Sequence, residues 1–312
     1  MTQPGQPPTD LERAVTALVQ ALRAGGAAAG LAGAELEDAV AGTLAFLRRR
    51  LTADFTVDEF GFDPDFTEHV YLPLLRPLFH QWFRTEVTGI EHVPAEGGAL
   101  VVANHAGAVA VDSLMTQVAV RETHPQRRYL RMLAADLVFA TPGVGPVARR
   151  TGSTLATHTD AERLLSSGEL VGVWPEGFKG VGKPFRDRYR LQRFGRGGFV
   201  AAALRTGVPI VPCAVVGAEE AYPVLGNASA LARVLGLPYL PLTPTFPWLG
   251  PLGLVPLPAK WLIQFCEPID TTGYGPAAAE DPEVVFELTD RVRETIQHTL
   301  YALLDRRGRV FG

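Results

Sequence analysis

From about residue 86 the chain alternates short, wholly apolar runs with segments of helical periodicity. Apolar runs of this length are typical of strands buried on both faces, and such alternation favours a parallel sheet with helices packed on it. The sequence therefore predicts an α/β fold, a largely parallel mixed sheet covered by helices. The expected strands are 99–104, 128–135, 152–157, 169–174, 208–217 and 260–269, and a long C-terminal helix is expected over 281–306.

The first 65 residues have a different pattern, which predicts an N-terminal helical region over 1–65. Thr9 and Glu12 form a capping box ahead of an amphipathic helix that should end near Gly25. A second helical pattern follows over 34–51, after a Gly/Ala-rich linker. We expect the two helices to form a hairpin.

The remaining residues, 66–312, are expected to form one α/β domain. Its first segment, 66–87, is apolar and aromatic, and it either lies at a membrane interface or caps the core. A later segment, 234–259, carries no charge and is long enough to cross a bilayer. Its seven prolines break a helix, so we expect a stiff, extended loop instead of a membrane span.

Composition excludes several classes of protein. An apolar fraction of 47% is too high for disorder, and 29 basic against 33 acidic residues argue against a nucleic-acid binder. Cys213 and Cys266 lie in apolar runs, where we expect buried small side chains and neither a disulfide nor a reactive thiol. The N-terminus lacks the basic and apolar pattern of a secretory signal, so a cytoplasmic setting is expected.

Two glycine-rich segments match phosphate-binding motifs only in part. Residues 177–183 fit the start of a P-loop, but Pro184 stands where a magnesium-binding hydroxyl is needed. Residues 143–148 resemble a dinucleotide fingerprint, yet no convincing strand leads into them. The sequence has no G-x-S-x-G motif and no histidine pair at metal-binding spacing, so we expect no metal and no cofactor.

A histidine and a carboxylate follow the apolar run 99–104. Asn104-His105 stands where that strand should end, and Asp112 comes seven residues after His105. In one helix the two would lie about 10 Å apart along the axis. We therefore expect a loop turned by Gly107, with Asp112 in the first turn of the next helix. The pair is either a general base with its orienting acid or a histidine satisfied by local backbone.

A basic block follows the strand expected at 169–174. The loop Pro175-Glu176-Gly177 leads into seven basic residues with Asp187 as the one acid among them. A glycine-bearing loop after a parallel strand can present N–H groups to an anion, so we expect contact with phosphate or an anionic surface. The basic residues are Lys179, Lys183, Arg186, Arg188, Arg190, Arg193 and Arg196.

Three ordered blocks together resemble the glycerolipid acyltransferases, the lysophosphatidic acid (1-acylglycerol-3-phosphate) acyltransferases and their relatives. The blocks are Asn104-His105 with its following Asp, the segment Trp174-Pro175-Glu176-Gly177, and Val208-Pro209-Ile210-Val211-Pro212. The resemblance covers about residues 85–270. It implies an acyl-CoA or acyl-carrier-protein donor, no metal, and peripheral attachment to the inner face of the membrane.

The resemblance also implies roles for individual residues. His105 matches the catalytic base and Asp112 its partner, while Glu176 and Gly177 match the acceptor-binding pair. We add Asn104, Lys179, Lys183 and Arg186 as candidate substrate-binding residues, and Leu240, Phe246, Trp248 and Leu249 as candidates for an acyl channel or a membrane contact. The backbone around Gly177 is the candidate donor to the oxyanion.

Two departures from the family's pattern concern the acceptor. Six residues separate His105 from Asp112, where the family most often has four. His158 stands where the family usually has an arginine that contacts the acceptor phosphate, and we expect a structural role for it.

The sequence thus predicts an O-acyltransferase acting on a lysophospholipid such as 1-acylglycerol-3-phosphate. The alternatives are a thioesterase or lipase-like hydrolase that uses the same pair on water, and a non-catalytic lipid-binding protein.

Overall fold

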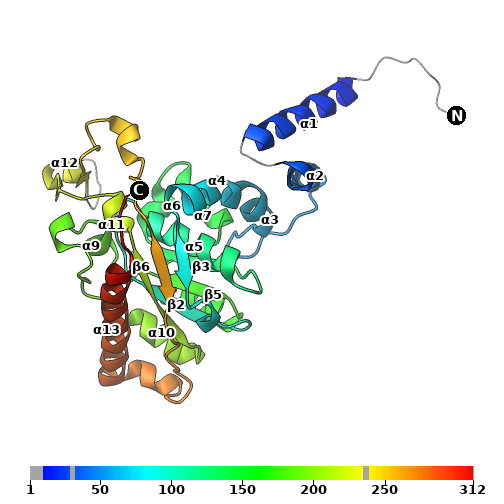
Figure 1. The fold of residues 1–312 in the computed structure, drawn as a ribbon. Coiled ribbons are helices and arrows are strands. Elements are labelled where there is room, and N and C mark those ends of the chain that lie inside the picture. The colour runs from blue at the N-terminus through cyan, green and yellow to red at the C-terminus, as the bar shows by residue number, and fades with distance from the viewer. Residues whose placement is uncertain (1–9, 29–31, 235–238, 312) are drawn as a thin grey trace.

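A computed structural model of the protein describes residues 10–28, 32–234 and 239–311. At its centre is a seven-stranded sheet in the order β1-β9-β6-β2-β5-β3-β4, shown in Figure 1. All neighbouring strands in this sheet are parallel except β6 and β9, which pair antiparallel. The predicted mixed, largely parallel sheet is therefore confirmed.

All six predicted strands form, each within a few residues of its expected range, and β1 at the sheet edge was not predicted. The sheet strands are β1 (Glu86–Thr88), β2 (Ala99–Ala103), β3 (Leu130–Ala134), β4 (Ser153–Leu155), β5 (Leu170–Val173), β6 (Ile210–Val216) and β9 (Leu262–Phe265). A separate antiparallel pair joins β7 (Gly226–Asn227) to β8 (Pro241–Leu242).

Helices pack on both faces of the sheet, and the N-terminal helix projects away from it. The described helices are numbered in chain order. They are α1 (Asp10–Ala28), α2 (Gly33–Leu51), α3 (Pro64–Phe66), α4 (Leu72–Pro77), α5 (Val111–Thr123), α6 (Asp136–Ala140), α7 (Val144–Arg150), α8 (His158–Ser166), α9 (Phe178–Val181), α10 (Gly198–Thr206), α11 (Ala218–Ala221), α12 (Ser229–Val234) and α13 (Pro282–Arg306). Short π or 3₁₀ turns occupy Thr67–Tyr71, Leu78–Trp82, Ile90–His92, Phe185–Asp187, Gly250–Leu254 and Pro276–Glu280.

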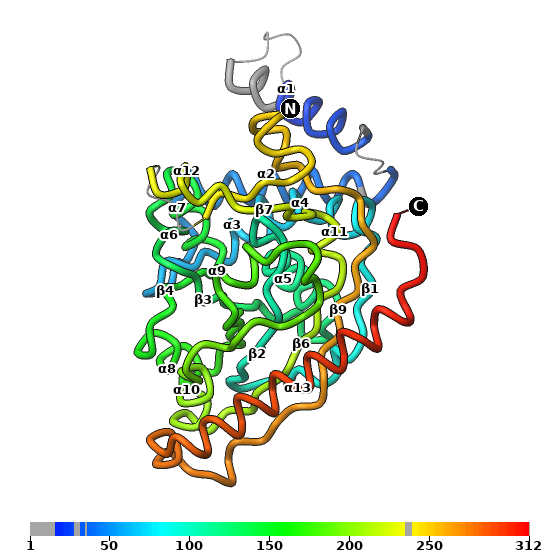
Figure 2. Tube along the Cα trace, turned by 90° about the vertical axis from the view of Figure 1, so that its left-hand side faces the viewer, coloured from blue at the N-terminus to red at the C-terminus, as the bar shows by residue number. Residues whose placement is uncertain are grey.

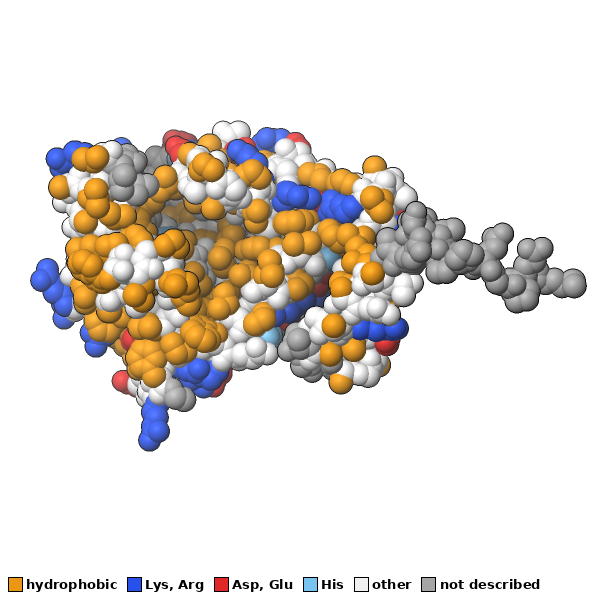
Figure 3. Space-filling model, turned by 90° about the horizontal axis from the view of Figure 1, so that it is seen from above, with side chains coloured by type: hydrophobic (Ala, Val, Ile, Leu, Met, Phe, Trp, Pro, Cys, Tyr) orange, Lys and Arg blue, Asp and Glu red, His pale blue; other side chains and the backbone are white. Residues whose placement is uncertain are grey.

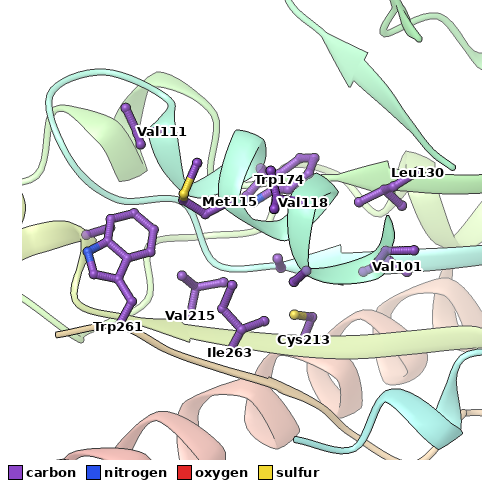
Figure 4. Close-up of a cluster of buried hydrophobic side chains, with 14 of the residues drawn as sticks. Val101, Val111, Met115, Val118, Leu130, Trp174, Cys213, Val215, Trp261 and Ile263 are labelled. Atoms are coloured by element: carbon purple, nitrogen blue, oxygen red, sulfur yellow. The ribbon is translucent and has the colours of Figure 1, made fainter. Parts of the chain in front are cut away.

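Alternate residues of β2 build two separate cores. Val101 packs with Met115 and Val118 of α5 on one face, and Figure 4 shows this cluster. Leu100 and Val102 belong to the opposite cluster, formed with α8, α10 and α13. The helix α13 packs against β6 and α10 along one side of the molecule (Figure 2). A strand buried on both faces in this way has no polar position, which explains its unbroken apolar sequence.

The N-terminal hairpin forms as expected, because α1 and α2 pack together and Arg23 pairs with Glu37 at 2.8 Å. The first helix continues to Ala28, beyond the predicted end near Gly25. The capping residue predicted at Thr9 lies outside the described residues. Figure 1 shows α1 projecting away from the α/β body.

The segment 66–87 caps the core. Leu72, Phe79 and Phe83 are buried, and Phe83 stacks on Trp261 with ring centroids 4.5 Å apart. Leu74 on the outer side is 71% exposed. Of the two predicted alternatives, the core-capping one therefore accounts for most of this segment.

The Pro-rich segment 234–259 is less uniform than the extended loop we expected. Beyond residues 235–238, which lie outside the described residues, it contains β8 and the 3₁₀ turn Gly250–Leu254. Within the described residues, none of the helices combines the length and the apolar character needed to cross a bilayer.

Candidate active site

His105 and Asp112 meet where β2 ends. The His105 Nδ1 and the Asp112 Oδ2 lie 2.7 Å apart, and the Asp112 side chain is fully buried. Asp112 is the second residue of α5 and also accepts the backbone N–H groups of Ala106 and Ser113, each at 2.8 Å. The predicted geometry, a turn at Gly107 (φ 85°) followed by Asp112 in the first helical turn, is confirmed.

This geometry fixes the histidine ring for base chemistry. A carboxylate accepts hydrogen bonds, so the His105 nitrogen that faces Asp112 carries the proton. The other nitrogen, Nε2, is then free to accept a proton, and His105 is among the residues that line a large pocket. An aspartate that orients an imidazole in this way is the arrangement of a general base.

Asn104 lies beside His105, and its side chain forms hydrogen bonds to a neighbouring strand of the sheet. Its side chain is buried, its Nδ2 donates to the Val215 carbonyl at 3.0 Å, and its Oδ1 accepts the Val215 N–H at 2.7 Å. Both ends of the amide are therefore used to tie the end of β2 to β6. The structure makes Asn104 a residue that positions His105, which differs from the substrate contact that we predicted.

Glu176 also contacts the backbone near His105. Its Oε1 accepts the His105 N–H at 2.8 Å, and its Oε2 accepts the Gln192 N–H at 2.6 Å. Burial raises the pKa of the Glu176 carboxyl, against the opposing effects of Lys183 and of these hydrogen bonds. The predicted acceptor-binding residue is thus engaged with the chain itself.

Glycines allow the loop after β5 to approach the histidine closely. A Cβ at Gly180 would lie 2.5 Å from the His105 carbonyl oxygen and 2.9 Å from its Cβ. Gly177 has a left-handed φ of 54°, and its N–H donates to the Trp174 carbonyl at 3.0 Å. The Gly177 N–H itself is therefore already used, and the prediction that the backbone around Gly177 supplies the oxyanion donor stays a prediction.

The pocket in front of His105 has a volume of about 810 Å³ and a mostly apolar wall. That volume is in the range of small-molecule sites, and Figure 3 shows hydrophobic side chains gathered around a hollow at this end of the molecule. The wall comes from β3, α6, α7, β5 and α9, and its larger apolar side chains are Met132, Leu133, Leu137, Val138, Val144, Val147, Val173, Trp174 and Phe178.

Much of this wall was missed in the sequence. Leu137, Val138, Val144 and Val147 lie on α6 and α7, around the segment that we considered as a weak dinucleotide fingerprint. Val144 and Val147 are three residues apart, a spacing that indicates one face of a helix. This signal was hard to recognise because Gly143, Gly145 and Pro146, which are poor helix formers, lie around it.

The predicted basic residues do not line the pocket. Lys183 is buried and pairs with Glu219 at 2.7 Å, whereas Lys179 is exposed and the Arg186 side chain is 85% exposed. His158 begins α8, and its ring packs so close to Gly198 that a Cβ there would lie 2.5 Å away. That close packing fits the structural role expected for His158.

The apolar candidates from 234–259 also lie outside the pocket wall. Leu240 and Phe246 are half-buried, while Trp248 and Leu249 are 75% and 58% exposed. From this segment it is Tyr239 that lines the pocket, and its hydroxyl donates to the Ala108 carbonyl. Burial, aided by the nearby charge of Asp112, raises the pKa of Tyr239 to about 12.

Among the described residues, neither the two cysteines nor any group of metal-ligating side chains forms a second functional site. Cys213 and Cys266 are free and buried as predicted, and burial raises the pKa of both thiols. Among the described residues, no three His, Cys, Asp or Glu side chains gather as a metal site would require.

Comparison with known proteins agrees with this architecture. Residues 84–216 match the family described as Acyltransferase, and this match includes His105, Asp112 and Glu176. A Mycobacterium tuberculosis protein, itself described as uncharacterized, is 60% identical over 277 residues, which are 89% of this chain and 77% of that protein. Residues 84–216 of the chain therefore belong to the acyltransferase family.

More distant relatives are also found. A Bos taurus protein named as a DGAT1/2-independent enzyme synthesizing storage lipids is 25% identical over 237 residues, 74% of this chain and 62% of that protein. The crystal structure of the 1-acyl-sn-glycerophosphate (LPA) acyltransferase PlsC from Thermotoga maritima aligns with a TM-score of 0.49 and 19% identity, over 85% of this chain and 97% of that one.

Proposed function

We propose that this acyltransferase moves a fatty acyl group from a thioester donor to the hydroxyl of a glycerolipid, with His105 as the general base. The observation that carries the proposal is the 2.7 Å contact between His105 Nδ1 and Asp112 Oδ2 beside an apolar pocket of about 810 Å³. The apolar wall suits a fatty chain, and the histidine supplies the base that a hydroxyl acceptor needs.

The reaction takes place in one transfer through a tetrahedral intermediate. His105 Nε2 removes the proton of the acceptor hydroxyl while its oxygen attacks the thioester carbonyl. Collapse of the intermediate breaks the carbon–sulfur bond, and the imidazolium returns the proton to the leaving thiolate. Asp112 keeps the ring oriented and stabilises its charged form. Positioned proton transfer of this kind contributes about 10²–10⁴-fold to the rate, or roughly 3–5 kcal/mol of barrier.

The substrates follow from the resemblance and from the site together. The donor is acyl-CoA or an acyl-carrier protein, and the motif blocks suggest a lysophospholipid such as 1-acylglycerol-3-phosphate among the possible glycerolipid acceptors. The name of the bovine relative, which concerns storage lipids, is in keeping with glycerolipids in general.

We propose that the end of the molecule that carries the pocket binds to a lipid surface. Exposed apolar side chains surround the pocket on α7, α9 and the segment 246–255, as Figure 3 shows. Exposed apolar patches of this kind mark membrane or protein contacts, and a membrane would deliver a lipid acceptor directly to the pocket. These side chains support the proposal that the enzyme attaches peripherally to a membrane, and the resemblance to glycerolipid acyltransferases implies the inner face. The most exposed of these side chains are Val144, Trp248, Leu249, Leu252 and Val255.

The test is acyl transfer by variants of the histidine and its partner. Release of CoA thiol from an acyl-CoA is measured with and without glycerolipid acceptors for the wild type, His105→Ala and Asp112→Asn. His105→Ala should retain less than a tenth of the wild-type rate, and Asp112→Asn should lose activity while circular dichroism shows an intact fold.

Other outcomes separate the alternatives. Thiol release that needs no alcohol acceptor would favour the hydrolase that the sequence also allowed. Lipid binding without any thiol release would favour a non-catalytic lipid-binding protein. A fully active His105→Ala variant would contradict the proposed mechanism.

A further inference from the structure

The pocket wall is neutral where a phosphorylated acceptor would need positive charge. Every Lys and Arg of the chain lies in the described ranges, and none lines the pocket. The remaining polar groups of the wall are hydroxyls, such as Ser113, Thr141 and Ser153. The chemistry of the wall is therefore that of an apolar cavity with a few neutral hydrogen-bonding groups.

Three cations near the site in the chain are bound elsewhere in the protein, and Lys179, which follows the lining residue Phe178, is exposed and is not among the lining residues. Lys183 follows the helix α9 but pairs with Glu219, and the two side chains are 2% and 5% exposed. Arg131, on the strand that also carries the lining residues Met132 and Leu133, is buried and pairs with Asp58 at 2.7 Å. Arg150, at the end of α7, pairs with Asp63 at 3.3 Å. Moving Lys183 or Arg131 to the pocket would take from Glu219 or Asp58 its ion-pair partner, whereas Asp63 would keep Arg50.

One buried hydrogen-bond donor of the wall has no partner in the protein. The indole Nε1 of Trp174 is buried without a hydrogen bond, and the ring centroid lies 6.1 Å from that of His105. A buried N–H is costly to leave unpaired, so a ligand oxygen at this place would be favoured. A neutral donor suits the carbonyl of an ester, whereas a phosphate needs charged partners once it leaves water.

We infer that the acceptor is an uncharged acylglycerol, a mono- or diacylglycerol, in place of a lysophospholipid whose phosphate enters the pocket. This inference rests on the proposed acyl transfer. The hydroxyl of the acylglycerol lies at His105 Nε2, its chains lie along the apolar wall of α6 and α7, and the Trp174 N–H donates to an ester carbonyl. The attacking oxygen loses its proton to His105 and gains the acyl group, and the donor thiol leaves with that proton.

The experiment compares three acceptors at equal mole fraction in the same neutral detergent micelles, with one acyl-CoA as donor. They are 1-oleoylglycerol, 1,2-dioleoylglycerol and 1-oleoylglycerol-3-phosphate. We expect kcat/KM for the better uncharged acceptor to exceed that for the phosphorylated one by at least tenfold. An equal or greater value for the phosphorylated acceptor would overturn the inference and leave the proposed function standing. If none of the three is acylated, both fail.

Two variants examine the charge and the donor separately. Val147→Lys puts a cation at a pocket position that is 41% exposed, and it should raise the relative use of the phosphorylated acceptor roughly tenfold. Leu51→Lys, at a position 88% exposed on α2, is the matched control and should leave the preference unchanged.

Trp174→Phe removes the N–H and keeps a ring, so it should raise KM for the acylglycerol about tenfold. An unchanged preference in Val147→Lys and an unchanged KM in Trp174→Phe would contradict the proposed contacts.

Discussion

The Glu176 carboxylate binds the backbone of His105, with its Oε1 accepting the His105 N–H at 2.8 Å. Its second oxygen accepts the Gln192 N–H at 2.6 Å, so one carboxylate joins the loop after β2 to the end of the basic block. The residue that the motif assigns to the acceptor is therefore, in this chain, a residue that positions the histidine.

Glu176→Gln should lower kcat more than it changes KM. The amide keeps one oxygen for one of the two N–H groups and turns its NH₂ toward the other, so a hydrogen bond to a charged group, worth about 1.5–3 kcal/mol, is lost. We expect kcat to fall roughly ten- to hundredfold. Steady-state kinetics with acyl-CoA measures this, and Glu280→Gln, at an exposed position, is the control. A rise in KM at constant kcat would restore the acceptor-binding role.

The buried pair Lys183–Glu219 makes a prediction about stability. Lys183→Met leaves the Glu219 carboxylate buried without its partner, and the free energy of unfolding should fall by about 3–5 kcal/mol. Adding Glu219→Gln should recover most of this loss, because the amide oxygen can still accept the Tyr189 N–H. Urea unfolding of the two variants measures both effects.

The loss in Lys183→Met should depend on pH. Burial raises the pKa of Glu219 above its ordinary value of 4.5, and loss of the ammonium removes an interaction that lowers it. An acid whose pKa is raised by folding destabilises the fold as pH rises from its unfolded pKa through its folded one. The deficit should therefore be larger at pH 8 than at pH 5. A deficit independent of pH would mean that Glu219 finds another partner.

The contact between His105 and Asp112 could be predicted because its geometry is local. Six residues separate His105 from Asp112, and a strand end, one glycine turn and the first turn of a helix bring their side chains together. The strands β2, β5 and β6 could be predicted for a similar reason, since each is an apolar run that is buried in the sheet.

The roles of the basic residues could not be predicted, because they depend on partners far away in the sequence. Lys183 pairs with a carboxylate 36 positions later, at Glu219, in a helix that carries no recognisable signal. The pocket wall on α6 and α7 could not be predicted from the sequence for a different reason. Each of these helices is at most 7 residues long, too short to show a clear helical period.

Removal of two exposed apolar side chains should weaken membrane binding. Trp248 and Leu249 are 75% and 58% exposed and follow Tyr239, which lines the pocket. In Trp248→Ser/Leu249→Ser we expect co-sedimentation with phospholipid vesicles to fall several-fold, since each buried apolar side chain contributes about 1.5–3 kcal/mol. Phe286→Ser, at an exposed position on α13, is the control. Unchanged co-sedimentation of the double variant would mean that this segment does not enter the lipid.

A methyl group at Gly180 should displace His105 without changing any of its polar side-chain partners. The Cβ of Gly180→Ala would lie 2.5 Å from the His105 carbonyl oxygen and 2.8 Å from the Glu176 Cβ, so the loop after β2 must shift. Overpacking of this kind typically costs 1–3 kcal/mol of stability. Displacement of His105 should reduce kcat at least tenfold, because proton transfer depends on its position. Gly273→Ala, where a Cβ meets no atom within 4 Å, should behave like the wild type in both assays. If Gly180→Ala lost stability but kept its kcat, the close approach of α9 would support the fold and not the orientation of His105.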